Sequence, residues 1–265
     1  MAKVKSNFLF SNNLGEYSVY KMKGVEKLCI RSKGGPSKEK IKTAPEFEEV
    51  RENNTEYGGC SKCTSIMHQA LIPIKQLSDY NFFNGLITIT KFIQNLDGVN
   101  PHGQQSIEMS ANRSLLVGFN LNKRHLFDTV IKANPSYTID RSGVSASITI
   151  PKLYPGMNFI NPWNFQVFRL VATLGIFPDL KYTSDGYKTM NDQKTFRPVK
   201  AQTDWMATET EQPATQMILS LNKEIIPDSS DTLMLSIGIE MGRILRSSII
   251  QPAARVGGAK ILGVG

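Results

Sequence analysis

The sequence predicts an α+β fold: an N-terminal β-hairpin and two or three helices, followed by a mainly antiparallel β-sandwich. Three patterns support this fold class. Polar and apolar residues alternate in two short segments before residue 32, apolar residues recur every three or four positions between residues 61 and 96, and alternation returns after residue 110. We therefore expect a hairpin and charged arm over residues 1–58, a helical segment over 59–110 and a β-sandwich domain over 111–265.

The first predicted element is a hairpin over residues 15–31 that turns at Lys23-Gly24. Its apolar residues stand at alternating positions: Tyr17, Val19, Leu28 and Ile30. An isolated two-stranded hairpin is only marginally stable in water. We therefore expect this hairpin to lie against a larger sheet, either its own or that of another subunit.

A charged segment follows the hairpin. The stretch IRSKGGPSKEKIKTAPEFEEVRENN, residues 30–54, contains four lysines, two arginines and five glutamates. Within it, Thr43-Ala-Pro-Glu46 has the form of a capping box with proline in the first turn, which predicts the start of a helix. Phe47 and Val50 are its apolar anchors, so we expect a short and mostly solvated helix. Gly58-Gly59 is expected to end it.

Two further helical stretches are predicted. The apolar positions between residues 61 and 77 keep a helical period, and Pro73 is expected to kink or divide this element. Ser78-Asp79 can cap the next helix, whose apolar residues recur every three or four positions over residues 82–96. The β-branched run 87–90 is also compatible with a strand. We favour a helix because the helical period extends over the longer segment.

The remainder of the chain predicts strands. Alternation of period two begins at Leu115 and continues to Leu121. Further strands are predicted over residues 137–140, 144–150, 165–177, 199–205, 217–221, 232–244 and 260–264. Turn-forming sequences such as Arg141-Ser-Gly and Tyr154-Pro-Gly separate these segments. Their spacing is typical of an antiparallel sandwich.

Composition and charge narrow the function classes. Hydrophobic residues make up 40% and charged residues 20% of the 265 residues, which excludes a mainly disordered chain. The net charge of +8 is concentrated at the two ends: residues 1–70 contain 12 Lys and Arg against eight Glu, and residues 241–265 contain four Lys and Arg and no acidic residue. Such ends suit nucleic acid, an anionic surface or an acidic patch on another copy.

The lack of a membrane-spanning run and of a secretory signal predicts the location of the protein, and the small number of cysteines predicts its redox state. No apolar run approaches the ~20 residues needed to cross a bilayer, and the apolar core of MAKVKSNFLFSNN is too short for a secretory signal. We therefore expect a cytoplasmic protein, while export by a route without a cleaved signal, or release in an assembly, is also compatible with the sequence. Cys29, Cys60 and Cys63 are too few for a disulfide scaffold.

Motifs for catalysis or metal binding are weak. Cys60-Ser-Lys-Cys63 is a CxxC motif, and Cys29 and His68 would complete a Cys3His set. Two small buried side chains explain a single CxxC motif about as well, so we expect no metal and no cofactor. His102 and His125 stand in other segments without a nucleophile motif beside them. We therefore expect that the protein is not an enzyme.

A second function is suggested by the loop from Asn158 to Phe165. It alternates amide side chains with aromatic ones, a composition that can stack on a sugar ring while hydrogen-bonding its edge. Trp163 is the natural stacking platform, with Asn158, Asn161 and Phe165 beside it. Packing of the aromatic residues against the end of the sandwich explains the same pattern and is the preferred interpretation. The alternative function is a β-sandwich module that binds carbohydrate or another ligand.

Several segments near the two ends carry a resemblance. They include Arg31-Ser-Lys-Gly-Gly35, Arg51-Glu-Asn-Asn-Thr-Glu-Tyr-Gly58 and the closing Gly258-Ala-Lys-Ile-Leu-Gly-Val-Gly265. Together with the hairpin before them, these segments resemble the start and the end of a group of uncharacterised Bacteroidetes proteins, a domain-of-unknown-function group. The resemblance implies a bacterial origin and a non-enzymatic module. It transfers no site residue.

These features favour a self-assembling structural protein, a subunit of a filament, tube or shell whose N-terminal arm contacts neighbouring copies. The lysines of the arm are followed at once by glutamates, which would repel nucleic acid and suit a protein surface of complementary charge. Nucleic acid is therefore disfavoured as a partner. The predicted apolar contacts are Tyr17, Val19, Tyr20, Ile30 and Phe47. The predicted charged contacts are Lys38, Lys40, Lys42 and Arg51.

Overall fold

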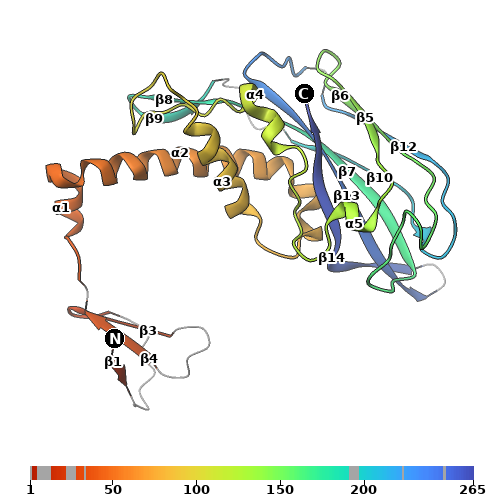
Figure 1. Ribbon diagram of the computed structural model, residues 1–265, viewed down its shortest axis with the longest axis horizontal. Coiled ribbons are helices and arrows are strands. Elements are labelled where there is room, and N and C mark those ends of the chain that lie inside the picture. Colours follow the sequence, from red (N-terminus) through yellow and green to blue (C-terminus); the bar gives the residue numbers. More distant parts are fainter. Residues whose placement is uncertain are drawn as a thin grey trace. The chain divides into compact units, whose positions relative to one another are not determined.

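The computed structural model describes residues 2–4, 13–21, 28–32, 34–190, 197–222, 224–246 and 249–265 (Figure 1). The fold is α+β, as predicted, with an N-terminal hairpin, helices and then mainly antiparallel sheets. The chain divides into two compact units, residues 1–51 and 52–265, which we call the N-terminal unit and the main unit. The domain boundaries expected at residues 58 and 110 stay predictions.

The N-terminal unit contains a small antiparallel sheet in the order β1-β4-β3-β2. Its strands are β1 (Ala2–Val4), β2 (Asn13–Leu14), β3 (Tyr17–Lys21) and β4 (Leu28–Ser32). The predicted hairpin is confirmed, because β3 pairs with β4 and places Val19 opposite Ile30. The predicted turn at Lys23-Gly24 lies outside the described residues.

The helices begin earlier than predicted, with α1 (Lys38–Thr43), the 3-10 helix η1 (Pro45–Phe47) and α2 (Glu48–Ala70). Ser37 caps α1 by accepting a hydrogen bond from the Lys40 amide at 3.1 Å. The capping box predicted at Thr43 is therefore wrong. Thr43 is instead the last residue of α1. Its hydroxyl donates to the Glu39 carbonyl at 2.9 Å, so it bonds within the last turn of α1 and does not cap the next helix.

Helix α2 passes through Gly58-Gly59, where the sequence predicted an end. The reason is a tertiary contact. A Cβ atom built at Gly59 would lie 2.6 Å from the ring of Tyr187, so this position needs a residue without a side chain. Packing of the helix within the main unit outweighs the low helix propensity of glycine, about 1 kcal/mol per residue.

The helical stretch predicted over residues 61–77 forms the second half of α2 and then η2 (Ile72–Leu77), and the next predicted helix is confirmed as α3 (Phe83–Gln94). Pro73 stands in the first turn of η2 and separates it from α2, as predicted. The predicted cap at Ser78-Asp79 is wrong, because Asn81 accepts the hydrogen bond from the Phe83 amide at 3.2 Å. The alternative strand over residues 87–90 is also excluded, since this segment lies within α3.

The strand predicted from Leu115 to Leu121 is wrong. This region holds the short helices α4 (Met109–Asn112), η3 (Arg113–Leu116) and, further on, α5 (Phe127–Val130). The segment after η3 lies beside strand β14 (Ile249–Val264) but does not form a continuous strand of the sheet. The Gly118 amide donates to the Ile261 carbonyl, and the Leu121 amide donates to the Ala259 carbonyl. Leu116 and Leu121 are buried here, whereas Leu115 and Val117, which belong to the predicted alternation, are exposed.

The other predicted strands are present, with somewhat different bounds, and β14 is much longer than predicted. The described strands of the main unit are β5 (Ser136–Asp140), β6 (Ser145–Ile150), β7 (Val167–Pro178), β8 (Leu180–Thr183), β9 (Gly186–Thr189), β10 (Val199–Gln202), β11 (Met206–Ala207), β12 (Thr215–Ser220), β13 (Asp231–Arg246) and β14 (Ile249–Val264). Strand β14 begins at Ile249, where the sequence predicted Lys260, because it pairs along β13. The β8–β9 hairpin and β11 were not predicted.

The main unit is built in three layers around β7 and β13. These strands form a central sheet in the order β10-β7-β13-β14, with β11 also beside β7. One face packs on an outer sheet, β12-β6-β5, through a core that includes Phe168 and Leu235. The other face is covered by α2, η2 and α3 through a second core that includes Val171 and Met234. Figure 1 shows the helices on one side of β7 and β13 and the outer sheet on the other.

The helices lie directly on the central sheet at glycine positions. A Cβ atom built at Gly175 of β7 would lie 2.4 Å from the Cβ atom of Ala70, at the end of α2. One built at Gly238 of β13 would lie 2.5 Å from the Leu77 side chain. Because heavy atoms do not approach this closely, both strands need glycine where the helical layer crosses them.

The neighbouring glycines of α2 provide a matched test of this packing. Gly58 is exposed with no atom near a built Cβ, so Gly58→Ala should raise the free energy of unfolding by about 0.5–1 kcal/mol through helix propensity alone. Gly59→Ala should lower it by about 1–3 kcal/mol, because the methyl group collides with the Tyr187 ring. Chemical denaturation of the two variants measures both changes, and equal effects would contradict this role of Gly59.

Candidate functional site

The structure places the predicted apolar contacts of the N-terminal unit on both faces of its sheet. Val19 and Ile30 are opposite each other on one face, while Tyr20 is opposite Cys29 on the other. Val19 is buried, Tyr20 and Ile30 are half-buried, and the Tyr17 side chain is 54% exposed. These side chains therefore do not form one continuous apolar face.

The predicted charged contacts are partly used within the N-terminal unit. Lys40 forms an ion pair with Glu46 at 2.7 Å, and its ammonium group lies 5.9 Å from the centre of the Phe47 ring. Arg51 donates to the carbonyls of Ile41 and Ala44, at 2.9 and 2.8 Å. Arg51 therefore holds the corner between α1 and α2. Lys38 and Lys42 are exposed on α1.

The loop from Asn158 to Phe165 satisfies its own amide side chains. Asn158 accepts from the Tyr154 amide at 2.6 Å and donates to the Lys152 carbonyl at 2.9 Å. Asn161 donates to the Phe165 carbonyl at 2.8 Å, and both Trp163 and Phe165 are half-buried against the core between the sheets. These contacts stabilise the loop itself. The carbohydrate-binding alternative stays a prediction without an added observation in its favour.

Cys60 and Cys63 face the helical core of the main unit as free, buried thiols. The Cys60 thiol donates to the Gln94 side-chain carbonyl at 3.1 Å. Burial raises the pKa of Cys60 to about 11 and that of Cys63 still further, so both stay protonated at neutral pH. Among the described residues, no group of three or more His, Cys, Asp or Glu side chains could hold a metal ion.

A buried polar cluster surrounds Glu56 on α2. Its carboxylate, fully buried, accepts from the Lys91 ammonium group at 2.5 Å and from the Gly103 amide at 2.7 Å. Lys91 also donates to Gln94 on α3 at 3.0 Å, and Gln94 donates to the Tyr187 hydroxyl at 2.8 Å. The cluster therefore ties the loop after α3 and the β8–β9 hairpin to the two helices.

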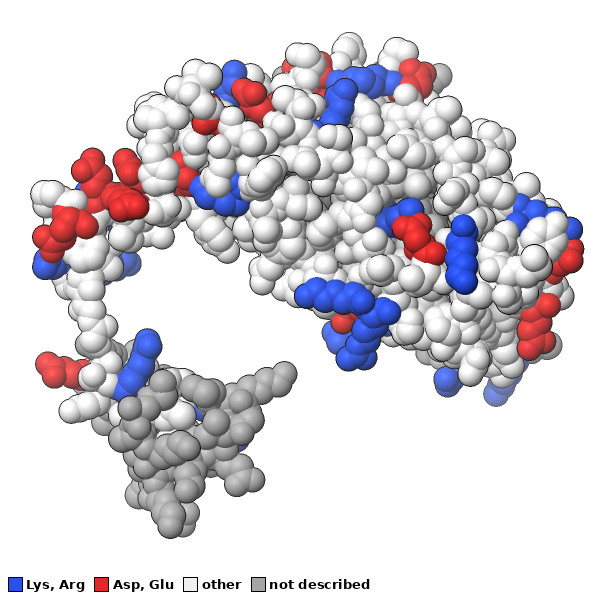
Figure 2. Space-filling model, in the orientation of Figure 1, with Lys and Arg blue, Asp and Glu red and all other residues white. Residues whose placement is uncertain are grey.

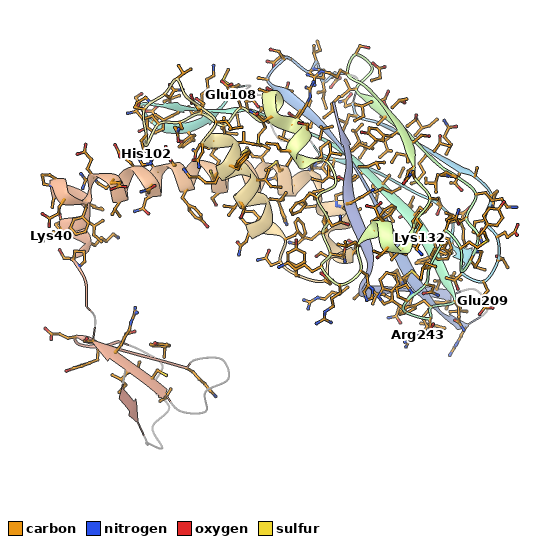
Figure 3. All side chains as sticks on the ribbon, in the orientation of Figure 1. Lys40, His102, Glu108, Lys132, Glu209 and Arg243 are labelled. Carbon is orange, nitrogen blue, oxygen red and sulfur yellow. The ribbon has the colours of Figure 1, made fainter. Side chains whose placement is uncertain are left out.

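His102 lies at the exposed edge of this cluster, beside α2 in Figure 3. Its ring contacts the Glu52 carboxylate at 3.0 Å and the Glu56 carboxylate at 3.6 Å. The hydrogen bond with Glu52 is the main cause that raises the pKa of His102. Since every member of the cluster has a partner, its geometry is that of a structural network.

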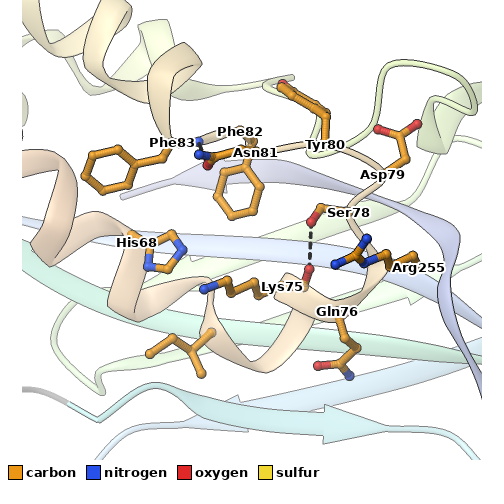
Figure 4. Close-up of a pocket in the computed structure, with 11 residues that line it drawn as sticks. His68, Lys75, Gln76, Ser78, Asp79, Tyr80, Asn81, Phe82, Phe83 and Arg255 are labelled. Atoms are coloured by element: carbon orange, nitrogen blue, oxygen red, sulfur yellow. Dashed lines mark hydrogen bonds between the residues drawn. The ribbon is translucent and has the colours of Figure 1, made fainter. Parts of the chain in front are cut away.

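A cavity of about 790 Å³ lies at the junction of α2, η2, the start of α3 and β14. Figure 4 shows His68 and Phe83 at one end of the cavity and Asp79 and Arg255 at the other, with Lys75 between them in this view. The remaining lining residues are Ile72, Gln76, Ser78, Tyr80, Asn81 and Phe82. A volume of this size is in the range of small-molecule sites, roughly 300–1,000 Å³.

Aromatic rings form one wall of the cavity. The imidazole of His68 stacks on the ring of Phe82 with centroids 5.5 Å apart and meets the Phe83 ring edge-on at 5.8 Å. Burial, and then the positive charge of Lys75, lower the pKa of His68 from its ordinary value of 6.5. His68 is therefore neutral at pH 7.

Cationic side chains form the other wall. Lys75 and Arg255 are exposed, and neither has an ion pair with any described residue. The carboxylate of Asp79 is held by the backbone amides of Lys123 and Arg124, at 2.8–3.2 Å. The cavity thus combines an aromatic wall with the carboxylate of Asp79 and two cations that have no ion pair among the described residues.

Sequence reasoning did not find this cavity. The sequence suggested His68 only as a possible member of a Cys3His set and Arg255 only as part of a basic C-terminal end. Lys75 stood in a predicted helix without any motif. These residues come from elements separated by up to 187 positions, so local spacing carries no signal that brings them together. The aromatic pair Phe82-Phe83 was predicted, but as core of a helix.

Comparison with known proteins adds no functional information. Neither models of protein families, nor curated protein sequences, nor solved structures give a significant match to this chain. In the described part of the chain, no helix is both long and apolar enough to cross a membrane.

The Glu56 cluster predicts a large loss of stability when its centre is removed. Glu56→Ala leaves the Lys91 ammonium group and the buried Gly103 amide without their partner, so we expect the free energy of unfolding to fall by about 2–4 kcal/mol. Glu49→Ala, in an exposed position of the same helix, should change it by about 0.5 kcal/mol or less. Equal losses in urea denaturation of the two variants would show that the cluster is not essential.

The pKa of His68 should respond to Lys75. Lys75→Met removes the charge and keeps an apolar chain, so the pKa of His68 should rise, yet stay below 6.5 because burial remains. Since folding lowers this pKa, the free energy of unfolding should fall as the pH drops below 6.5. An NMR titration of the His68 ring measures the pKa, with Lys181→Met on β8 as the control outside the cavity. A lower or unchanged pKa in Lys75→Met contradicts the proposed influence of Lys75.

Proposed function

We propose that the protein is a self-assembling structural subunit of a filament, tube or shell, in which the N-terminal segment, residues 1–58, contacts neighbouring copies. The observation that carries this proposal is the poor core of the N-terminal unit. Among its described residues, Val19 and Cys29 are the buried apolar side chains, and they lie on opposite faces of the sheet. Helix α1 has no buried residue.

A sheet of this kind needs a packing partner. Small sheets become stable when an apolar face is covered by another layer or by a helix. Tyr17 is exposed, and Leu28 and Ile30 are only half-buried, so a docked surface would remove further apolar area from water. Each 100 Å² of apolar area buried in this way contributes about 2.5 kcal/mol.

The main unit offers an exposed apolar end that suits this role. Strands β13 and β14 pair as far as Arg246 and Ile249, and residues 243–246 are exposed at the end of this hairpin. Ile244, Leu245 and Ile249 expose 43, 54 and 53% of their surfaces there. Large apolar side chains grouped at one exposed end are typical of a contact surface.

Charge also favours a second copy as the partner of this end. The hairpin end carries Arg243 and Arg246, and residues 241–265 include no acidic residue. The N-terminal segment carries exposed Glu46, Glu48 and Glu49, and Figure 2 shows acidic side chains gathered over α1 and the start of α2. In Figure 3, Lys40 marks this acidic region and Arg243 the hairpin end. One chain therefore presents a basic hairpin end and a group of exposed glutamates, which lie beside the exposed Lys38 and Lys42 of α1.

A contact between two different surfaces of neighbouring copies can repeat without limit. Such heterologous contacts generate rings when the rotation closes and filaments or tubes when it does not. Complementary charge sets the orientation and the rate of association, while the apolar side chains supply most of the affinity. Assembly of this kind should weaken at high ionic strength.

The proposal predicts which changes abolish assembly. Removal of residues 1–35, or Leu245→Glu in the full chain, should convert an assembled protein into a folded particle near 29.5 kDa, or slightly less for the truncated chain. Ile218→Glu, at an isoleucine that is 68% exposed on β12, is the matched control and should leave the assembly unchanged. Sedimentation velocity over a range of concentration and salt, with electron microscopy, measures the outcome.

Two results would contradict the proposal. One is that the intact chain stays monomeric at high concentration in low salt. The other is that the truncated protein and Leu245→Glu assemble as the intact chain does. Circular dichroism of each variant separates loss of assembly from loss of folding.

A further inference from the structure

The cavity between α2, η2, α3 and β14 is lined by two positively charged side chains, Lys75 and Arg255. Neither side chain has an ion pair among the described residues. Other exposed cations of the main unit, such as Lys181, also have no ion pair there, so what distinguishes these two is that they line the same cavity. An anion that enters the cavity would meet both free cations. Charge-assisted hydrogen bonds from Arg and Lys are among the strongest that proteins make to carboxylates and phosphates.

We propose that this cavity binds a small molecule that joins an aromatic ring to a carboxylate or phosphate group. The inference does not depend on self-assembly, because all lining residues belong to the main unit.

The aromatic wall fits the ring of such a ligand. Phe82 is buried and holds His68 in a stacked position, while Phe83 and Tyr80 are half-buried at the rim. Ile72, which is 53% exposed, extends the apolar surface towards solvent. Aromatic side chains prefer offset or edge-on contacts with a further ring, and each such contact adds affinity beyond that of buried area.

The backbone at Arg255 supports a binding role for its guanidinium group. Arg255 has a φ of +58°, in the left-handed region that residues other than Gly, Asn and Asp rarely adopt. Arg255 lies between Pro252 and Gly257, in the stretch of β14 where the pairing with β13 shifts. Strain of this kind is concentrated at ligand sites, where a side chain must point in a set direction.

The surroundings of the two cations also favour an anion. The N-terminal end of α3, which is 12 residues long, faces the cavity through Asn81 and Phe83 and carries the positive end of the helix dipole. Asp79 contributes a negative charge, but its oxygens accept hydrogen bonds from the amides of Lys123 and Arg124. His68 is neutral in the free protein, so its ring can contact an aromatic ligand and adds no positive charge beside Lys75.

Phenyl phosphate and benzoate are suitable probes of the intact protein. Both should shift the NMR signals of the His68 ring and bind in calorimetry with saturable affinity. Benzyl alcohol lacks the charge, benzylamine carries the opposite charge, and inorganic phosphate lacks the ring, so each should bind at least about tenfold more weakly. If neither probe shifts the His68 signals, or if inorganic phosphate binds as tightly as phenyl phosphate, the proposal is wrong.

Arg255→Gly separates binding from folding. Glycine tolerates the left-handed backbone, so this variant should keep or raise the melting temperature while it weakens binding of phenyl phosphate about tenfold or more. Lys75→Met should weaken binding to a similar extent and serves as the second variant if Arg255→Gly does not fold. Lys181→Ala, exposed on β8 outside the cavity, should bind as the native protein does. Unchanged affinity in both cavity variants would overturn the proposal.

Discussion

The structure depends on the burial of β7 and β13 on both faces. Their paired segments, from Asp231 opposite Pro178 to Gly242 opposite Val167, contribute side chains to two separate cores. A strand pair of this kind cannot face water on either side, so it requires a helical layer and a second sheet at the same time. The close contact of Gly175 with Ala70 then sets where the helical layer lies.

This constraint explains both the buried network and the cavity. Because the second half of α2 lies against the sheet, Cys60 is buried there. Glu56, in the first half of α2, contacts Lys91 of α3 and the Gly103 amide, and Lys91 neutralises its buried charge. At the far end, α2 stops at Ala70 and η2 turns at Pro73 before α3 begins. The cavity lies at this change of direction, between the end of α2, η2 and the start of α3. Stability and the proposed ligand site thus arise from one packing arrangement.

The proposed functions use the parts of the chain that this packing does not bury. Among the described residues, the main unit holds nearly all the buried apolar side chains, while the N-terminal unit contributes Val19 and Cys29. The exposed end of the β13–β14 hairpin is continuous with residues 231–242 of β13, which are buried, so its apolar side chains extend from a packed strand. A rigid surface loses little conformational entropy on binding, which favours association between copies.

The sequence by itself determined the α+β class, the hairpin of β3 and β4, helix α3 and most strands of the sandwich, because each follows from periodicity and turn residues among near neighbours in the chain. Only the tertiary structure decided that α2 continues through Gly58-Gly59, that residues 117–121 run beside β14, and that Lys75, His68 and Arg255 share one cavity. These features depend on contacts between distant segments, such as Gly59 with Tyr187, and the free energy of such contacts exceeds that of local propensity.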